Sequence, residues 1–165
     1  MRAAMLPLND PRWNELTTFF EDSAYLTKHL AEWLAAIGFD QERDIYSHCL
    51  FNLYLHQGTI TNAAFAVAPY LIAVCENGTS DFSVEYLTDF AYIEANRLTH
   101  GLYYNRQNTA EFPEWLMNDY RLAVAKAPNL VDDAVDNCYD DDRKRELVAM
   151  KPAFFGNGKL AWEQR

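Results

Sequence analysis

Apolar residues recur along this chain with the spacing of an α-helix almost throughout. The clearest example is a stripe at intervals of three and four residues, made of Leu26, Leu30, Trp33, Leu34 and Ile37. This spacing places the five side chains on one helical face. Ser23 precedes the stripe as an N-cap residue, and Gly38 follows it where a left-handed residue commonly ends a helix. The pattern therefore predicts a helix over residues 23–37.

Similar patterns predict seven further helices and no strands. An early helix begins at Pro11 after the cap residue Asp10, and its apolar face is formed by Trp13, Leu16, Phe19 and Phe20. The other six span residues 40–55, 60–75, 81–98, 113–127, 128–138 and 140–150. Residues 100–112 show no period and are predicted to form the longest loop. The tail after Pro152 is expected to be pinned by Phe154 and Phe155 and then to fray.

The predicted helix over residues 60–75 is apolar on most of its sides. It consists mainly of Ala, Val, Leu and Ile, and a helix with this composition is buried on most sides. It should therefore be the central element of the fold. Pro69 lies within it and is expected to kink it, because proline removes a backbone donor and crowds the preceding turn.

The number of helices and their connections predict the class of fold. Successive helices joined by about two to five residues pack as antiparallel neighbours. A chain of 165 residues is long enough to form one domain with a sizeable core. These features predict a single all-α domain over residues 1–165 with about eight helices. Periodicity leaves open whether the helices form a bundle or a short α-solenoid.

The net charge of −10 narrows the range of partners. It opposes binding to nucleic acids and to anionic membranes, because both carry negative charge. It favours a basic partner, whose approach would be accelerated by long-range attraction. The alternative is that the acidity only keeps the protein in solution.

The cysteines and the N-terminus predict the compartment. Cys49, Cys75 and Cys138 are odd in number and far apart, so we interpret them as small buried hydrophobic residues rather than as disulfides or zinc ligands. The sequence has no apolar run long enough to cross a bilayer, and its N-terminus lacks the apolar core of a signal peptide. We therefore expect a protein of the reducing cytoplasm.

No sequence motif indicates an enzyme, a metal site or a cofactor. Walker-type glycine loops, Gly-x-Ser-x-Gly, His-Glu-x-x-His and Cys-x-x-Cys are all absent. His48 and His56 are too far apart on one helix to hold the same metal. Cys49 follows His48 directly, and adjacent helical side chains point about 100° apart. We expect a binding protein without catalytic residues, metal or cofactor.

The tetrapeptide His56-Gln57-Gly58-Thr59 is the most distinctive local feature. It suits a tight turn between two helices. His56 and Gln57 can hydrogen-bond the last carbonyls of the preceding helix, Gly58 supplies a positive φ, and Thr59 or Thr61 can cap the next helix. We interpret it as a structural corner; direct contact with a partner is the alternative.

This tetrapeptide lies near the start of a segment, LYLHQGTITNAAFAVAPYLIAVC, that resembles a HEAT-like domain common among the immunity proteins of bacterial polymorphic toxins. The matching positions are His56, Gln57, Gly58, Thr59, Ala63, Ala64, Ala68, Pro69, Tyr70 and Leu71. The resemblance covers residues 11–76 well and residues 113–150 loosely, as a weaker second unit with an early arginine, Arg143. Residues 100–112 depart from the pattern.

The resemblance implies a fold and a function. The fold would be a HEAT-like stack of antiparallel helix hairpins. The function would be that of a stoichiometric inhibitor, which binds a cognate toxin and blocks its active site. Two other classes remain open. One is a HEAT-like scaffold or adaptor without a toxin, and the other is a small helical enzyme with a pocket that gathers His56 or His100 with carboxylates.

Two segments are candidates for the partner-binding surface. The first is an aspartate run made of Asp132, Asp133, Asp136, Asp140, Asp141 and Asp142, which contains no basic residue. One interpretation is a docking patch for a basic toxin; if that toxin were a nuclease, the aspartates would mimic the phosphates that it binds. The alternative is a solvated face with helix caps. The second is the aromatic loop with Tyr103, Tyr104 and Arg106. These residue types are favoured at binding hot spots, although the tyrosines could instead cover the core.

Overall fold

The computed structural model describes residues 5–20, 22–37, 40–56, 59–77, 82–99 and 112–165, and this part of the chain is mainly α-helical. Its α-helices are α1 (Ser23–Ala35), α2 (Asp40–Tyr54), α3 (Ala63–Asn77), α4 (Ser83–Leu98), α5 (Glu114–Asn137), α6 (Asp141–Met150) and α7 (Gly158–Gln164). Two short 3₁₀ helices, η1 (Pro11–Glu15) and η3 (Lys151–Phe155), and two strands, β1 (Leu55–His56) and β2 (Thr59–Ile60), complete it. The all-α prediction is confirmed apart from the small pair of strands.

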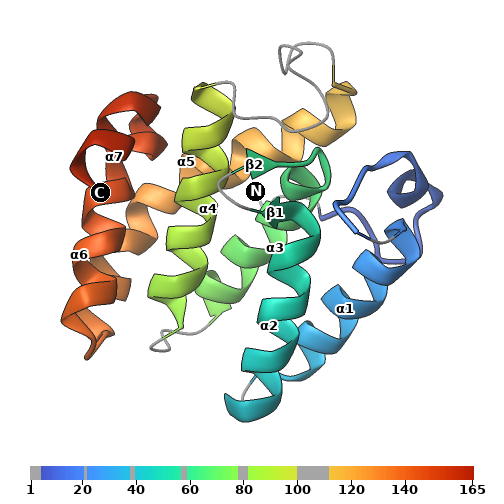
Figure 1. Cartoon of the computed structure of the whole chain (residues 1–165), viewed down its shortest axis with the longest axis horizontal. Helices are drawn as coiled ribbons and strands as arrows, with labels where there is room; N and C mark the ends of the chain where they lie inside the picture. The colour runs from blue at the N-terminus through green and yellow to red at the C-terminus, as the bar shows by residue number, and fades with distance from the viewer. Residues whose placement is uncertain (1–4, 21, 38–39, 57–58, 78–81, 100–111) are drawn as a thin grey trace.

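The helices lie in two layers. Figure 1 shows α2, α4 and α6 in front and α3 and α5 behind them, with α1 beside α2. Consecutive helices pack in pairs, α1 on α2 and α3 on α4, and the contacts continue within the layers from α3 to α5 and from α4 to α6. Helix α7 packs against α4 and α6 at the end of the molecule.

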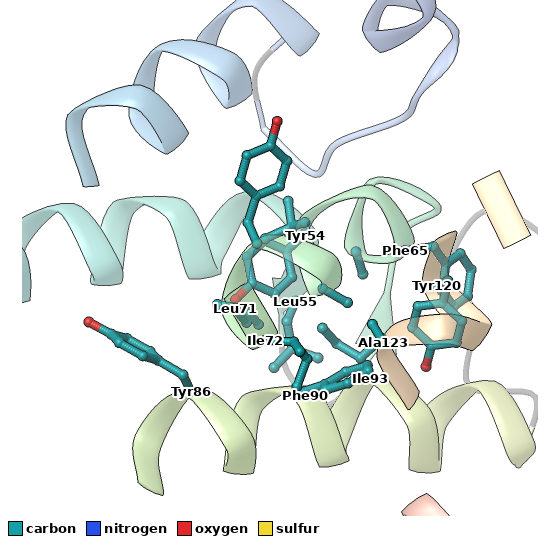
Figure 2. Packing of buried hydrophobic residues seen from close by; sticks show 14 of the residues in the cluster. Tyr54, Leu55, Phe65, Leu71, Ile72, Tyr86, Phe90, Ile93, Tyr120 and Ala123 are labelled. Atoms are coloured by element: carbon teal, nitrogen blue, oxygen red, sulfur yellow. The ribbon is translucent and has the colours of Figure 1, made fainter. Parts of the chain in front are cut away.

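Helix α3 is the central element, as its composition predicts. Every residue from Ala63 to Ile72 is buried, and Pro69 lies inside the helix. Figure 2 shows Leu71 and Ile72 packed above the side chains of α4, with Phe65 facing Tyr120 of α5. The rings of Phe65 and Tyr120 meet edge to face with centroids 4.8 Å apart. A helix buried on nearly all sides leaves recognition to the outer elements.

The predicted boundary at Pro128 is wrong. Helix α5 runs without interruption from Glu114 to Asn137 with Pro128 inside it. An internal proline costs a helix about 3 kcal/mol. Here the buried face continues past the proline and offsets that cost by packing, through Leu116, Met117, Tyr120, Ala123, Ala127, Val131 and Ala134.

The predicted first α-helix is only the 3₁₀ turn η1. Asp10 caps it as expected, since its Oδ1 accepts a hydrogen bond of 2.9 Å from the backbone N–H of Arg12. Leu16 is already extended, and Phe20 is 62% exposed rather than on the buried face. Indole Nε1–H of Trp13 donates to the carbonyl of Pro7, which anchors the segment without a longer helix.

Helix α1 begins where predicted, but its N-cap residue and the burial of the last residue of its apolar stripe differ from the prediction. Asp22, not Ser23, is the N-cap, because its carboxylate accepts from the N–H groups of Ala24 and Tyr25. Leu26, Leu30 and Trp33 are fully buried, Leu34 is partly buried, and Ile37 is exposed. Gly38 lies outside the described residues.

The chain after Pro152 does not fray. Gly156 turns it with a φ of +81°, and α7 then packs against α4. An added Cβ on Gly158 would lie 2.8 Å from Leu98 Cβ and 3.0 Å from the Ala95 carbonyl oxygen, so glycine permits this close contact.

The cysteines are free thiols, and Cys75 and Cys138 are buried as predicted, whereas Cys49 is partly exposed. Burial raises the pKa of Cys75 to about 12. Among the described helices, none is long and apolar enough to cross a membrane.

Candidate functional site

The distinctive tetrapeptide lies in a minimal β-hairpin between α2 and α3. β1 and β2 are antiparallel, with Leu55 opposite Ile60 and His56 opposite Thr59. Thr59 Oγ1 donates a hydrogen bond of 2.8 Å to the His56 carbonyl. Gln57 and Gly58 lie outside the described residues, so the predicted positive φ of Gly58 stays a prediction.

The predicted capping role of the threonines is wrong. Thr59 is used within the hairpin, and the Thr61 hydroxyl is buried with no hydrogen-bond partner in the described part of the chain. The extended backbone at Thr59 and Ile60 also delays the start of α3 to Ala63. The corner is therefore held by strand pairing and burial rather than by a helix cap.

His56 lies among aromatic rings, and no carboxylate of the described residues is paired with it. Its ring contacts Phe19 at a centroid distance of 5.7 Å and meets Phe20 edge-on at 4.8 Å. The Phe19 N–H also donates to the Leu53 carbonyl, which ties the N-terminal segment to this corner. The interpretation of His56 and Thr59 as a structural corner agrees with these contacts.

The aspartate run is divided between two helices. Asp132, Asp133 and Asp136 are exposed on α5, and Asp140 caps α6 after α5 has ended at Asn137. Asp140 Oδ1 accepts from the N–H groups of Asp142 and Arg143, and these hydrogen bonds lower its pKa. Asp140 therefore caps α6, as predicted, and does not lie on α5 with Asp132 and Asp136, although the spacing of the three by four residues would place them on one face of a longer helix.

Basic residues near the aspartate run neutralise much of it. Ion pairs join Lys151 to Asp132 at 2.8 Å, Arg143 to Asp140 at 3.6 Å, Lys144 to Asp141 at 3.7 Å and Arg145 to Asp142. Asp133 and Asp136 have no ion pair with any described residue. Tyr139, which the sequence analysis did not select, is 91% exposed between the two groups of aspartates. Its position in the turn of an acidic segment is the signal that could have found it.

A polar cleft adjoins the aspartate run on the face formed by α2, α4 and α6. It has a volume of about 360 Å³ and is lined by Ser47, His48, Phe51, Glu85, Asp89 and Arg143. A second hollow of about 270 Å³ shares Glu85, Asp89 and Arg143 and extends to Tyr92, Glu146 and Arg165. Arg143 pairs with both Asp140 and Glu85, so it links the aspartate run to the cleft.

Two of the three carboxylates that line the cleft and the second hollow have partners. Arg143 Nη1 lies 3.2 Å from Glu85 Oε2, and Glu146 accepts from the Tyr92 hydroxyl and lies 3.8 Å from Arg165 Nε. Asp89, between them, has no hydrogen bond or ion pair with any described residue.

The surroundings of Asp89 disfavour its charged form. Burial raises its pKa well above the ordinary value for aspartate, and the nearby charges of Glu85 and Glu146 raise it further. Asp89 also contributes to the raised pKa of Tyr54, after the larger effect of burial. Strongly shifted groups in a cleft are typical of functional sites.

The cleft was not predicted from the sequence, although a signal is present on α4. Glu85, Asp89 and Tyr92 recur at helical intervals and are partly buried, whereas Thr88, which shares their hollow, is buried and donates to the Val84 carbonyl. Ser47 and Arg143 come from distant segments that only the fold brings together. Arg143, noted as the early arginine of the second unit, is part of this cleft.

Four other residues that the sequence suggests for binding or catalysis lie outside the described residues: Tyr103, Tyr104, Arg106 and His100. The cleft contains His48 instead of His56, and His48 Nε2 lies 3.1 Å from Asn52 Nδ2. Within the described ranges, no group of three or more histidine, cysteine or acidic side chains is placed to hold a metal ion.

Comparison of the chain with models of known families, with curated proteins and with solved structures gives no match.

Proposed function

We propose that this protein is an immunity protein that binds a cognate bacterial toxin and blocks its active site in the cytoplasm of the producing cell. The observation that carries the proposal is the resemblance of the segment from His56 to Leu71 to HEAT-like immunity proteins. The position of this segment supports the proposal, because it forms the corner and the buried helix α3 around which the other helices pack.

We also propose that the two layers are a HEAT-like stack. Three helix pairs follow one another along the chain, α1 with α2, α3 with α4 and α5 with α6. The second and third pairs contact each other through α3 and α5 in one layer and through α4 and α6 in the other, and the first pair meets the second where α2 contacts α3. Stacked pairs of this kind expose one row of helices as an extended binding surface.

The proposed mechanism is steric block assisted by charge. The row of α2, α4 and α6 presents the polar cleft, and the exposed Asp133, Asp136 and Tyr139 lie beside its α6 end. Negative charge attracts a basic toxin surface over long distances, and an exposed tyrosine provides contact area at low entropic cost. The inhibitor needs no chemistry of its own.

Growth rescue tests the proposal. The protein encoded by the neighbouring gene is produced in bacteria with or without this chain, and an unrelated toxin serves as the specificity control. We expect toxicity from the neighbouring product alone, normal growth with both proteins, and a one-to-one complex on purification. If both proteins are soluble and growth is not restored, the immunity proposal is wrong; a tight complex with a non-toxic protein would support the adaptor alternative instead.

Charge reversal tests the contribution of the aspartate run. Asp133→Lys combined with Asp136→Lys leaves the α6 cap and the four ion pairs of the run intact. We expect this variant to associate about tenfold more slowly with the toxin at low salt and to dissociate at a nearly unchanged rate. An unchanged association rate at low salt would exclude electrostatic steering by these residues.

A further inference from the structure

We infer that the cleft between α2, α4 and α6 is a binding site for one basic side chain, an arginine or a lysine of a protein partner, which docks against Asp89. The inference deepens the proposed function and rests on it only in taking the partner to be a toxin. It replaces the aspartate run as the centre of the predicted contact and leaves that run a steering role.

The first observation is the size of the cleft. A water molecule takes up about 30 Å³ in the liquid. The volume of about 360 Å³ therefore has room for a guanidinium or ammonium group together with its alkyl chain. Phe51 forms part of the wall and offers an aromatic surface of the kind on which cationic groups commonly pack.

The second observation is that the carboxyl group of Asp89, which lines the cleft on α4, lacks a partner among the described residues. The neighbouring carboxylates are occupied, since Glu85 pairs with Arg143 and Glu146 accepts from Tyr92 and pairs with Arg165. Polar groups away from bulk solvent nearly always have a partner, so an unpaired carboxyl group in the cleft indicates a missing donor.

A cationic side chain supplies the donors that Asp89 lacks. Guanidinium has five N–H groups in a planar fork, and ammonium has three, and neither has an acceptor. The carboxylate favours arginine, because the guanidinium fork can donate to both oxygens of one carboxylate at once.

The charges in the cleft favour a cation over an anion. The arginines of the cleft, Arg143 and Arg165, are paired with Glu85 and Glu146, so no described basic side chain is left for an anion. An ionised Asp89 gives the two arginines and three carboxylates a balance of one negative charge. One basic side chain restores neutrality.

The raised pKa of Asp89 makes binding depend on pH. A docked cation favours the ionised carboxylate and so lowers the pKa of Asp89 toward its ordinary range, which means that binding releases a proton. Affinity should therefore increase as pH rises toward the pKa of Asp89 in the free protein. The imidazole of His48 also lines the cleft. The other charged or titratable groups described around Asp89 are Tyr54, Glu85, Tyr92, Arg143, Glu146 and Arg165.

A small probe tests this site without the toxin. The full-length chain is titrated with n-butylguanidinium at up to about 50 mM, a range that suits a ligand of few atoms. Binding is followed by NMR through the amide signals near Ser47 and the side-chain carboxyl carbon of Asp89. We expect saturable shifts at these two residues, affinity that rises with pH above the ordinary range of an aspartate, and weaker binding of n-butylammonium. n-Butanol and acetate should not bind.

Variants distinguish a specific site from general attraction to an acidic protein. Asp89→Asn should remain folded and lose at least about tenfold in probe affinity. Asp133→Asn is the matched control, because it removes an exposed carboxylate without an ion pair from α5 and should bind the probe like the parent. Equal probe binding by folded Asp89→Asn, preference for acetate, or no saturable shift in the parent would each overturn the inference. If the probe binds but growth is not rescued, the inferred cation site stands, and only the proposal that a toxin supplies the basic side chain is wrong.

Discussion

Two of the three carboxylate side chains on helix α4, Glu94 and Asp89, have sharply different surroundings. Glu94 is 2% exposed and accepts two hydrogen bonds of 2.6 Å from Arg97 and one of 2.5 Å from the Tyr120 hydroxyl. Asp89 faces the cleft and has no such partner among the described residues. The same helix thus contains both a buried, fully partnered carboxylate and an unpartnered carboxyl group.

The difference separates structural from functional use of a charged side chain. Through Tyr120, Glu94 links α4 to α5, so its buried charge fixes how the back of the molecule packs. Asp89 makes no hydrogen bond or ion pair that joins α4 to another described element, and an unpaired group of this kind reduces the stability of the fold. Groups that reduce stability without a structural role are typical of binding sites, where the partner supplies what is missing.

The largest expected loss of stability follows from substitution of Glu94, the carboxylate that has partners. Glu94→Gln should lower the free energy of unfolding by about 3 kcal/mol, because it leaves the largely buried Arg97 without its counter-charge. Urea denaturation followed by circular dichroism measures this change. A loss below about 1 kcal/mol would show that solvent already compensates Arg97.

A smaller loss is expected at the junction of α4 and α7. Gly158→Ala should cost about 1–3 kcal/mol, because the added methyl group meets Leu98 and the Ala95 carbonyl oxygen. Gly156→Ala is the matched comparison: no atom lies within 4 Å of its added Cβ, and only its φ of +81° is unfavourable, at about 1 kcal/mol. Equal losses measured in urea would show that α7 can move away from α4 at no cost.

Substitution of Asp89, the carboxyl group without a partner, should increase the free energy of unfolding instead of lowering it. Asp89→Asn should raise the free energy of unfolding by about 1 kcal/mol at neutral pH, because the charged form is disfavoured in the fold. An unfolded aspartate ionises near pH 4, whereas folded Asp89 keeps its proton to higher pH. The advantage of the variant should therefore be absent below about pH 4 and grow as pH rises toward the raised pKa. Thermal unfolding across this range checks it; a variant that is destabilised at every pH would indicate a structural role for Asp89.

The smallest effect is expected in the aspartate run. Asp132→Asn breaks the ion pair with Lys151, but the Asp132 side chain is 80% exposed. Pairs in such positions contribute little, so the free energy of unfolding should change by less than about 0.5 kcal/mol. Urea denaturation is again the measurement. A loss above about 1 kcal/mol would give the run a structural role in joining α5 to the end of α6.

Local sequence patterns predict a helix well where the spacing of its apolar residues and its capping residue are enough to determine which side chains are buried. The buried positions of α1, the burial of α3 and the cap of α6 at Asp140 follow from spacing and capping chemistry. Pro128 was predicted to separate two helices because local propensity gave no measure of the packing that carries α5 through it. The strands at His56 and Thr59 are too short to show an alternating pattern.

The candidate site was harder to predict for a physical reason. The aspartate run was visible as composition, but its ion pairs to Lys151 and Arg143 depend on how α6 and η3 fold back. Ser47 and Asp89 line one cleft only because α2 and α4 flank it in space. Whether a polar residue lacks a partner is a property of the packed structure, and no spacing rule contains it.

The dissociation constant of the complex with the neighbouring gene's product, for the parent and Asp89→Asn, tests the central claim most directly. The claim is that the cleft at Asp89 is where this chain binds its partner. We expect at least about tenfold weaker binding by Asp89→Asn, in a variant that unfolds at a higher temperature than the parent. Asp133→Asn should bind within about twofold of the parent. Equal affinity of the parent and a folded Asp89→Asn would contradict the account.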